Sequence, residues 1–325
     1  MRVLVAGGAG YIGSHTAREL LDRGIEVTIF DDFSTGRREL VPGGEAVEIV
    51  EGDLMDKEAV RAAFRKRRFE AVLHFASLIQ VGESYRDPAK YYTHNLDTSL
   101  NLLDAMREAG VRNFIFSSSA AVYGVPEVVP IPEDHPLKPI NPYGQTKLFV
   151  ERILEDYGRA YGLRYVSLRY FNAAGADPGG RMGEMHDPET HLIPNILLHL
   201  LDRAPALEVY GTDFPTPDGT AVRDYIHVTD LAAAHALALE KLLAGGESLV
   251  LNLGTNRGYS VLEVIRKVEE VTGRKVSIDN RPRRQGDVPV LLASKEKAER
   301  VLGWTLRLSD LETIIRTAWS WHSKL

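Results

Sequence analysis

The sequence predicts an α/β protein, in which a doubly wound parallel sheet carries a smaller, mixed α/β lobe. The first half alternates short apolar runs with amphipathic stretches. The apolar runs, expected to be strands, occupy residues 2–6, 26–30, 46–51, 71–75, 113–117 and 164–169. The amphipathic stretches, expected to be helices, occupy residues 13–22, 57–65, 95–108 and 143–161. Because these strands are mostly apolar throughout, we expect helices on both faces of the sheet.

The texture of the sequence changes after Phe171, where Gly, Pro and acidic residues dominate 175–189 and again 211–219. Both stretches are expected to be loops. Helices are expected at 192–203, 229–243, 261–272, 294–302 and 309–324, and short strands at 207–210, 249–253 and 275–278. We therefore divide the chain into residues 1–171 and 172–325. The second part is rich in loops and suited to closing over a ligand on the first.

Composition excludes several functional classes. The net charge of −6 leaves no basic stripe for a nucleic-acid backbone, so no nucleic-acid partner is expected. The chain has 0 cysteines, which excludes disulfides, thiolate metal sites and a cysteine nucleophile. Apolar runs stay shorter than the roughly 18 residues that a bilayer span needs. We expect a cytoplasmic enzyme without a membrane partner.

A glycine-rich turn follows the first predicted strand and opens the first predicted helix. Its sequence is Gly7-Gly8-Ala9-Gly10-Tyr11-Ile12-Gly13. Glycines let the backbone approach a pyrophosphate, and the helix N-terminus offers free N–H donors, as in Rossmann-type folds. A purely structural glycine turn is the alternative. Asp31, about 20 residues further on, ends the second strand and suits the two ribose hydroxyls of NAD rather than a 2′-phosphate.

The next two strands also end in residues that belong at such a site. Asp53-Leu54 follow the third strand, and Phe75-Ala76-Ser77 follow the fourth. Carboxyl ends of parallel strands are where these sheets bind ligands. For Asp53 the alternative is a helix N-cap. Together with the glycine turn, these positions predict a bound dinucleotide.

Three residues form a candidate catalytic set. Tyr143 and Lys147 stand four apart at the start of a helix and share one face, and Ser119 follows the fifth strand. A free tyrosine is a poor base at neutral pH, but a nearby ammonium and a positively charged nicotinamide both favour the phenolate. A surface pair on a helix is the default explanation of this spacing. Its place after a dinucleotide fold favours catalysis.

Several motifs resemble the extended short-chain dehydrogenase/reductase family. They are Ser-Ser-Ser-Ala-Ala-Val-Tyr-Gly at 117–124, Asn-Pro-Tyr-Gly-Gln-Thr-Lys at 141–147 and Arg-Tyr-Phe-Asn at 169–172. Three further stretches, at 210–216, 219–228 and 283–287, narrow the resemblance to the UDP-glucose 4-epimerases. The resemblance covers essentially the whole chain. It implies an NAD-binding domain at 1–171 that also carries the catalytic residues, and a UDP-sugar-binding domain at 172–325.

The resemblance also implies roles for the catalytic set. Tyr143 would take the proton from the sugar 4-hydroxyl while C4 delivers hydride to NAD. Ser119 would hydrogen-bond that oxygen, and Lys147 would hold the nicotinamide ribose and tune Tyr143. The 4-keto sugar would then turn in the site and take the hydride back on its other face. UDP-glucose and UDP-galactose would be interconverted, with UDP-N-acetylhexosamines as additional substrates.

By the same resemblance, Asn172, Arg223 and Arg284 face the diphosphate, Tyr210 the uracil and Asp287 the uridine ribose. Surface ion pairs are the alternative for the two arginines. The complete substrate set is Ser119, Tyr143, Asn172, His191, Leu192, Val209, Tyr210, Arg223, Arg284, Asp287 and Leu291. The complete cofactor set is Gly7, Gly10, Tyr11, Ile12, Gly13, Asp31, Asp32, Phe33, Ser34, Thr35, Gly36, Asp53, Leu54, Phe75, Ala76, Ser77, Ile79, Asn95, Ser117, Tyr143, Lys147 and Phe171.

Two positions depart from the pattern of the resembling enzymes. Ile79 stands where many of them carry Lys, which removes a possible contact to the cofactor and is expected to reduce its affinity. Leu291 stands where sugar-selective members carry Tyr. His186 and His191 flank Asp187 and Glu189, but their spacing fits no zinc helix motif, so a loop near the nucleotide is expected and no metal.

Related activities are weighed against the same residues. Sugar-nucleotide 4,6-dehydratases carry Asp-Glu directly after the strand-end hydroxyl and UDP-glucuronate decarboxylases keep a Glu there, where this chain has Ala120 and Ala121. Another UDP-sugar 4-epimerase specificity, or a catalytically silent NAD-binding regulator, stays open. Apolar stripes on the helices 95–108 (Leu96, Leu100, Leu103) and 143–161 exceed what one chain can bury, so a homodimer is expected.

Overall fold

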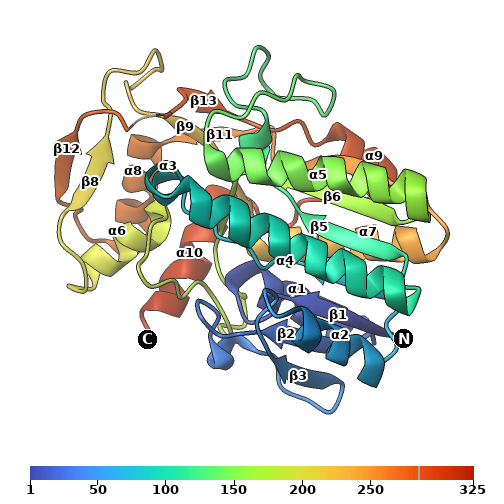
Figure 1. Ribbon diagram of the computed structural model, residues 1–325. Coiled ribbons are helices and arrows are strands. Elements are labelled where there is room, and N and C mark those ends of the chain that lie inside the picture. The colour runs from blue at the N-terminus through green and yellow to red at the C-terminus, as the bar shows by residue number, and fades with distance from the viewer. Residues whose placement is uncertain (285) are drawn as a thin grey trace.

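A parallel sheet of seven strands forms the centre of the protein, in the order β10-β6-β5-β4-β1-β2-β3 (Figure 1). The computed structural model describes residues 1–284 and 286–325. The strands are β1 (Arg2–Ala6), β2 (Glu26–Asp31), β3 (Val47–Glu51), β4 (Ala71–His74), β5 (Asn113–Ser117), β6 (Arg164–Tyr170) and β10 (Leu249–Leu253). The predicted α/β fold with a Rossmann-type parallel sheet is confirmed.

Helices cover both faces of this sheet. On one face lie α2 (Lys57–Lys66), α4 (Pro88–Ala109) and α5 (Pro142–Tyr161), which share a core with β4 and β5. Figure 1 shows α4 and α5 side by side in front of the sheet. On the other face lie α1 (Tyr11–Asp22), α7 (Val228–Leu243) and α9 (Glu296–Leu302), which share a second core with β1 and β6. The two cores explain why the central strands are apolar on both faces.

Two smaller sheets and three helices make up the second lobe. One sheet has the order β11-β9-β13, with β7 also pairing β9, and the other joins β12 to β8. The strands are β7 (Asn172–Ala174), β8 (Leu207–Tyr210), β9 (Val222–His227), β11 (Gly258–Ser260), β12 (Ile278–Arg281) and β13 (Val290–Leu291). The helices α6 (Leu192–Leu200), α8 (Val261–Thr272) and α10 (Leu311–His322) pack together in a core of their own.

Several element boundaries differ from the sequence prediction. Helix α4 begins at Pro88 rather than residue 95, because Asp87 caps it and Pro88 fits its first turn. The strand expected at 275–278 is β12, from Ile278 to Arg281. The short helix α3 (Val81–Arg86) and the strands β7, β9, β11 and β13 were not predicted. Each is short or carries polar residues that hide the pattern.

The central sheet does not end with the first part of the chain, because its edge strand β10 lies in residues 172–325. Strand β10 pairs parallel with β6, from Leu249 beside Val166 to Leu253 beside Tyr170. Helix α7 packs against α1. Residues 228–253 therefore pack with the first part, although they lie within 172–325. The division at 171 stays a prediction about binding roles.

Within residues 1–284 and 286–325, the helices are all too short or too polar to cross a membrane.

Candidate active site

The glycine turn between β1 and α1 brings backbone close to backbone. Gly7 has φ +77, and a Cβ there would lie 2.5 Å from the Ala76 backbone nitrogen. A Cβ on Gly13 would lie 2.1 Å from the Gly7 carbonyl oxygen. Gly10 is the N-cap of α1 and has no side chain to occupy the helix N-terminus. Residues 7–13 thus form a glycine-lined helix N-terminus, which suits a phosphate group.

Tyr11 and Ile12, the other predicted members of this turn, lie in the first turn of α1. The buried Tyr11 hydroxyl donates to the Gly175 carbonyl at 2.6 Å. This bond ties the glycine turn to the loop after β7. Tyr11 therefore joins the two predicted parts of the chain at the site.

Asp31 ends β2 beside the glycine turn. Its carboxylate is buried and accepts from the backbone nitrogens of Ala9 at 2.8 Å and Phe33 at 2.9 Å. Burial raises the pKa of this carboxyl, while the two N–H donors oppose the rise. A Cβ on Gly36 would lie 2.7 Å from Asp31 Oδ1, so the loop after β2 folds over the carboxylate. The Asp31 carboxylate is therefore held in place by backbone N–H groups at the predicted ribose site.

The rest of the loop after β2 lies nearer the surface. The Asp32 carboxylate accepts from the backbone nitrogen and hydroxyl of Ser34, and Thr35 is exposed. Phe33 has φ 58, and the Arg38 guanidinium lies 4.0 Å from the centre of its ring. These residues flank Asp31 and stay predicted cofactor contacts.

The carboxyl ends of β3 and β4 lie at the same edge of the sheet. Asp53 accepts from Met55 N at 2.8 Å, and Asp56 rather than Asp53 caps α2, which removes the N-cap explanation for Asp53. Asn95 on α4 is buried. Its side-chain oxygen accepts from Leu78 N at 2.8 Å, and its side-chain nitrogen donates to Thr146 Oγ1 at 3.0 Å. Phe75, Ala76 and Ser77 follow β4, Leu54 is buried in the core beside α2, and the Ile79 side chain is 41% exposed.

Ser119, Tyr143 and Lys147 come together beyond the end of β5. Lys147, on the second turn of α5, is buried and its Nζ donates to the Ser117 carbonyl at 2.9 Å. The same Nζ lies 5.8 Å from the centre of the Tyr143 ring. The Ser117 hydroxyl pairs with the Tyr170 hydroxyl at 2.5 Å. The spacing of Tyr143 and Lys147 along one helix face therefore delivers both groups to the strand end.

The charges in this set differ in one respect from the sequence prediction. Burial raises the pKa of the Tyr143 phenol, and a hydrogen bond with Ser119 opposes the rise. Burial lowers the pKa of Lys147 to about 7, while the Glu151 carboxylate opposes that change. The protein alone thus keeps Tyr143 protonated, because a buried phenolate loses its hydration. The lowering predicted for Tyr143 has to come from a ligand's charge.

Sequence analysis missed the buried ion pair that supports this set. Glu151, one turn after Lys147, binds the Arg169 guanidinium through two oxygens, with Nη2–Oε2 2.5 Å and Nε–Oε1 2.9 Å. Both side chains are 4% exposed. Glu151 also accepts from the Ser118 hydroxyl at 2.6 Å, and Arg169 donates to the Tyr123 hydroxyl at 2.9 Å. The pair fixes the strand end on which Ser119 lies.

The second lobe gathers the predicted diphosphate and uridine residues. Arg223 on β9 lies 3.9 Å from Asp287, and Arg284 Nε lies 3.3 Å from the same carboxylate. The Arg284 guanidinium also lies 4.8 Å from the centre of the Tyr210 ring. Burial lowers the pKa of Arg223, whose side chain is 16% exposed. Gln285, within the motif 283–287, lies outside the described residues.

The remaining predicted substrate residues are more scattered. Asn172 on β7 donates to the Asp224 carbonyl at 3.0 Å. Val209 is 1% exposed and packs into the core of the second lobe. Leu192 is partly buried against the same core. Their side chains are therefore less available to a substrate than that of Arg284. Leu291 and Phe171 pack against the cluster that contains Ala120 and Leu148. His191 lies in a loop beside Glu184.

Comparisons with known proteins support the site. The profile of the NAD dependent epimerase/dehydratase family matches residues 3–254. The chain is 52% identical to the UDP-glucose 4-epimerase of Azospirillum brasilense, over 100% of this chain and 92% of the relative. The crystal structure of UDP-glucose 4-epimerase from Brucella ovis in complex with NAD is 52% identical, with TM-score 0.94 over 98% of this chain and 97% of that one.

A second similar structure contains a bound sugar nucleotide. It is the UDP-glucose-4-epimerase from Stenotrophomonas maltophila with bound NAD and formylated UDP-arabinopyranose, 42% identical with TM-score 0.95 over 100% of this chain and 98% of that one. Fold, site and full-length identity agree. The chain belongs to the NAD dependent epimerase/dehydratase family, among the UDP-glucose 4-epimerases.

Proposed function

We propose that this chain interconverts UDP-glucose and UDP-galactose by oxidising and re-reducing C4 of the hexose on a bound NAD. One observation carries the proposal: Tyr143, Ser119 and Lys147 meet at the same sheet edge as the glycine turn and Asp31. The full-length relatives named above are UDP-glucose 4-epimerases.

The residues at the sheet edge fit NAD. A Cβ at Gly7 or Gly13 would collide with backbone. The first turn of α1, whose N-cap Gly10 has no side chain, offers its N–H groups to a pyrophosphate. Asp31 keeps a fixed, buried carboxylate for the ribose hydroxyls, where a 2′-phosphate would meet like charge. NAD, when bound, supplies the hydride acceptor and donor for C4.

The chain's own groups move the proton. Tyr143 takes the proton of the 4-hydroxyl as C4 is oxidised and returns it when the 4-keto group is reduced. Ser119 hydrogen-bonds the reacting oxygen. Lys147 would hold the nicotinamide ribose, and the positive charge of the oxidised nicotinamide would lower the Tyr143 pKa that burial raises. Reduction from either face gives the two epimers.

The second lobe holds the rest of the substrate. Arg223 and Arg284 offer planar forks of donors to the diphosphate, and their shared partner Asp287 takes the uridine ribose. Asn172 adds an amide, and Tyr210 lies against the uracil. In this proposal residues 1–171 bind NAD and carry the catalytic residues, and residues 172–325 bind the UDP-sugar. A cytoplasmic location stays a prediction.

A single incubation tests the proposal. Purified protein is given UDP-galactose without added cofactor, and products are identified by chromatography. We expect UDP-glucose, because the cofactor is returned unchanged in each cycle. Denatured protein is expected to release about one NAD per chain. Release of NADP would contradict the role of Asp31, and a protein that binds NAD without any turnover would be a regulator.

We propose a homodimer built on the outer faces of α4 and α5, with the same patch on both copies. On α5, Phe149 is 39% and Tyr161 52% exposed. The Phe149 ring lies 6.1 Å from the Tyr92 ring of α4. Of the stripe predicted on α4, however, Leu103 is 1% exposed and packs inside its own chain. The patch is therefore smaller and more aromatic than the sequence suggested.

Light scattering at micromolar concentration is expected to show a dimer, and Phe149→Asp to shift it to a monomer. Charge in the centre of an apolar interface is costly to bury. The control is Ile278→Asp on β12, because Ile278 is equally exposed at 40% but lies in the other lobe. A wild-type monomer, or equal dissociation by both variants, would refute this interface.

Leu291 is proposed to set the range of sugars. It lies on β13 beside Arg223 of β9 and packs against the cluster of Ala120, next to Ser119. Leu lacks the phenol ring that narrows the pocket in sugar-selective relatives. Removing a steric block relaxes specificity without a new contact. We expect measurable conversion of UDP-N-acetylglucosamine, slower than that of UDP-glucose.

Leu291→Tyr is expected to suppress the acetamido reaction and to leave UDP-galactose turnover within about a few-fold. Initial rates on both substrates measure the effect. Equal loss on both substrates, or no acetamido turnover in the wild type, would show that Leu291 is not the gate.

A further inference from the structure

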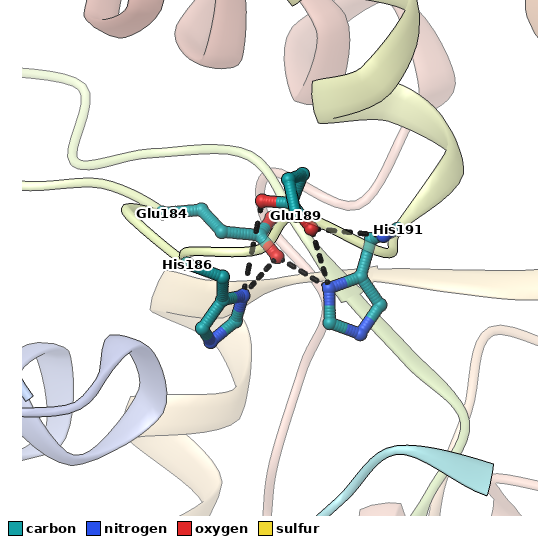
Figure 2. A group of neighbouring side chains, drawn as sticks. All are labelled: Glu184, His186, Glu189 and His191. Carbon is teal, nitrogen blue, oxygen red and sulfur yellow. Dashed lines mark hydrogen bonds and ion pairs between the residues drawn. The ribbon is translucent and has the colours of Figure 1, made fainter. Parts of the chain in front are cut away.

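Two histidines and two glutamates converge in the loop between β7 and α6. They are Glu184, His186, Glu189 and His191, and one ligand atom from each lies within 4.8 Å of the others (Figure 2). The carboxylates are the most buried members, with Glu184 3% and Glu189 6% exposed. In the sequence, His186 and His191 flank Asp187 and Glu189, and their spacing predicts a loop and no metal. The fold replaces Asp187, whose side chain is 83% exposed, with Glu184.

The donor atoms face one another. His186 Nδ1 lies 2.9 Å and His191 Nδ1 2.6 Å from the same oxygen, Glu184 Oε1. Glu189 oxygens lie 3.8 Å from His186 Nδ1 and 3.2 Å from His191 Nδ1. Figure 2 shows both rings turning Nδ1 toward the carboxylates. In a tetrahedral zinc site with bonds of about 2.0–2.1 Å, neighbouring donors lie about 3.3 Å apart. The observed separations fall on both sides of that value.

We propose that this cluster binds one divalent transition-metal ion of the zinc class, through His186 and His191 Nδ1 and one oxygen each from Glu184 and Glu189. Two imidazoles select such ions over Mg²⁺ and Ca²⁺, which prefer ligand sets of oxygen alone. Two carboxylates and two neutral imidazoles also balance the charge of a divalent ion. The cluster is distinct from the catalytic set of Ser119, Tyr143 and Lys147, although His191 also belongs to the predicted substrate set.

The surroundings indicate a structural purpose. The Trp321 indole of α10 donates to the Glu184 carbonyl at 3.1 Å, and the His186 ring lies 6.2 Å from the ring of Tyr11. His191 is the residue before α6. A metal here would tie three things together: the glycine turn, the loop after β7 and the start of α6. It would thereby fix the junction between the cofactor and sugar sides of the site.

The competing state is a metal-free network in which both rings carry a proton and pair with the carboxylates. The test uses the purified protein with its retained cofactor, freed of adventitious metal by dialysis against a chelator. Zn²⁺ is then added, and bound metal is measured by equilibrium dialysis. We expect one Zn²⁺ per chain at about 10 µM free metal. Substitution with Co²⁺ is expected to give the intense visible absorption of a four-coordinate site.

The variants His186→Gln and Glu189→Gln are each expected to weaken Zn²⁺ binding at least about 10-fold. Asp187→Asn is the matched control, because this exposed acid lies in the same loop between them and should bind as the wild type does. Should the variants fold poorly, X-ray absorption of the zinc-loaded wild type decides. Two nitrogen and two oxygen donors support the site. Absence of stoichiometric binding, an all-oxygen shell, or unchanged affinity in both folded variants overturns it.

Discussion

Tyr143→Phe is expected to lower turnover of UDP-galactose by about 10²- to 10⁴-fold, the usual contribution of a positioned acid or base. The change removes only the hydroxyl, so the partly buried ring keeps its place on α5. Because Arg223 and Arg284, the proposed diphosphate residues, lie in the other lobe, binding of UDP should barely change. The measurement is kcat from initial rates, with UDP affinity determined by calorimetry.

Tyr157→Phe is the matched control for this effect. It removes a hydroxyl from the same helix, but one that bonds to Asp104 at 3.1 Å, away from Ser119 and Lys147. Its turnover is expected to stay within about a few-fold of wild type. Activity of Tyr143→Phe in that same range would dismiss Tyr143 as the base.

Arg169→Leu is expected to lower the free energy of unfolding by about 3–5 kcal/mol, because it leaves the Glu151 carboxylate buried without its counter-charge. Both side chains are 4% exposed, so water cannot replace the lost partner. Denaturant unfolding followed by circular dichroism measures the loss. Turnover of the folded fraction should also fall, since Glu151 holds Ser118 beside Ser119.

The double variant Arg169→Leu/Glu151→Leu separates charge from packing. Removing both members leaves no isolated charge, and such replacements often cost little. The double variant is therefore expected to be more stable than Arg169→Leu alone. If the two are equally unstable, lost packing rather than the isolated Glu151 charge explains the effect.

Strands β1, β2, β4 and β5 were predictable because burial on both faces leaves a local signature of mostly apolar runs. Strand β10 was predicted as a strand, but it was placed in the second part of the chain and not in the central sheet. Strand β9 carries Arg223 and Asp224 within that kind of run, and so it was missed. Asp224 is 1% exposed and accepts from Thr255 and Ala293, partners distant in sequence. Burial raises its pKa to about 6. Buried polar residues whose hydrogen-bond partners are distant in sequence leave no periodic pattern from which a strand could be predicted.

The site residues differ in the same way: some have a local signal in the sequence and others do not. Tyr143 and Lys147 are four apart on one helix, so their proximity follows from helix geometry alone. The meeting of Arg223, Arg284 and Asp287 required a family resemblance. The convergence of Glu184 with His186 and His191 depends on how one irregular loop folds, and loops of this length have no repeating pattern. Neither Glu184 nor the Glu151–Arg169 pair had a local signal.

The position of β10 at the edge of the central sheet affects how the chain folds as it is made. Strand β6 ends at Tyr170, but its neighbour begins at Leu249, about 80 residues later. At roughly 5–20 residues per second, the ribosome needs some 4–16 s to deliver that strand. During this interval β6 keeps an open edge, and α1 lacks the covering helix α7. During this period the nascent first half is exposed to aggregation through the open edge of β6. The exposure ends when α7 and β10 have been synthesised and pack onto the sheet.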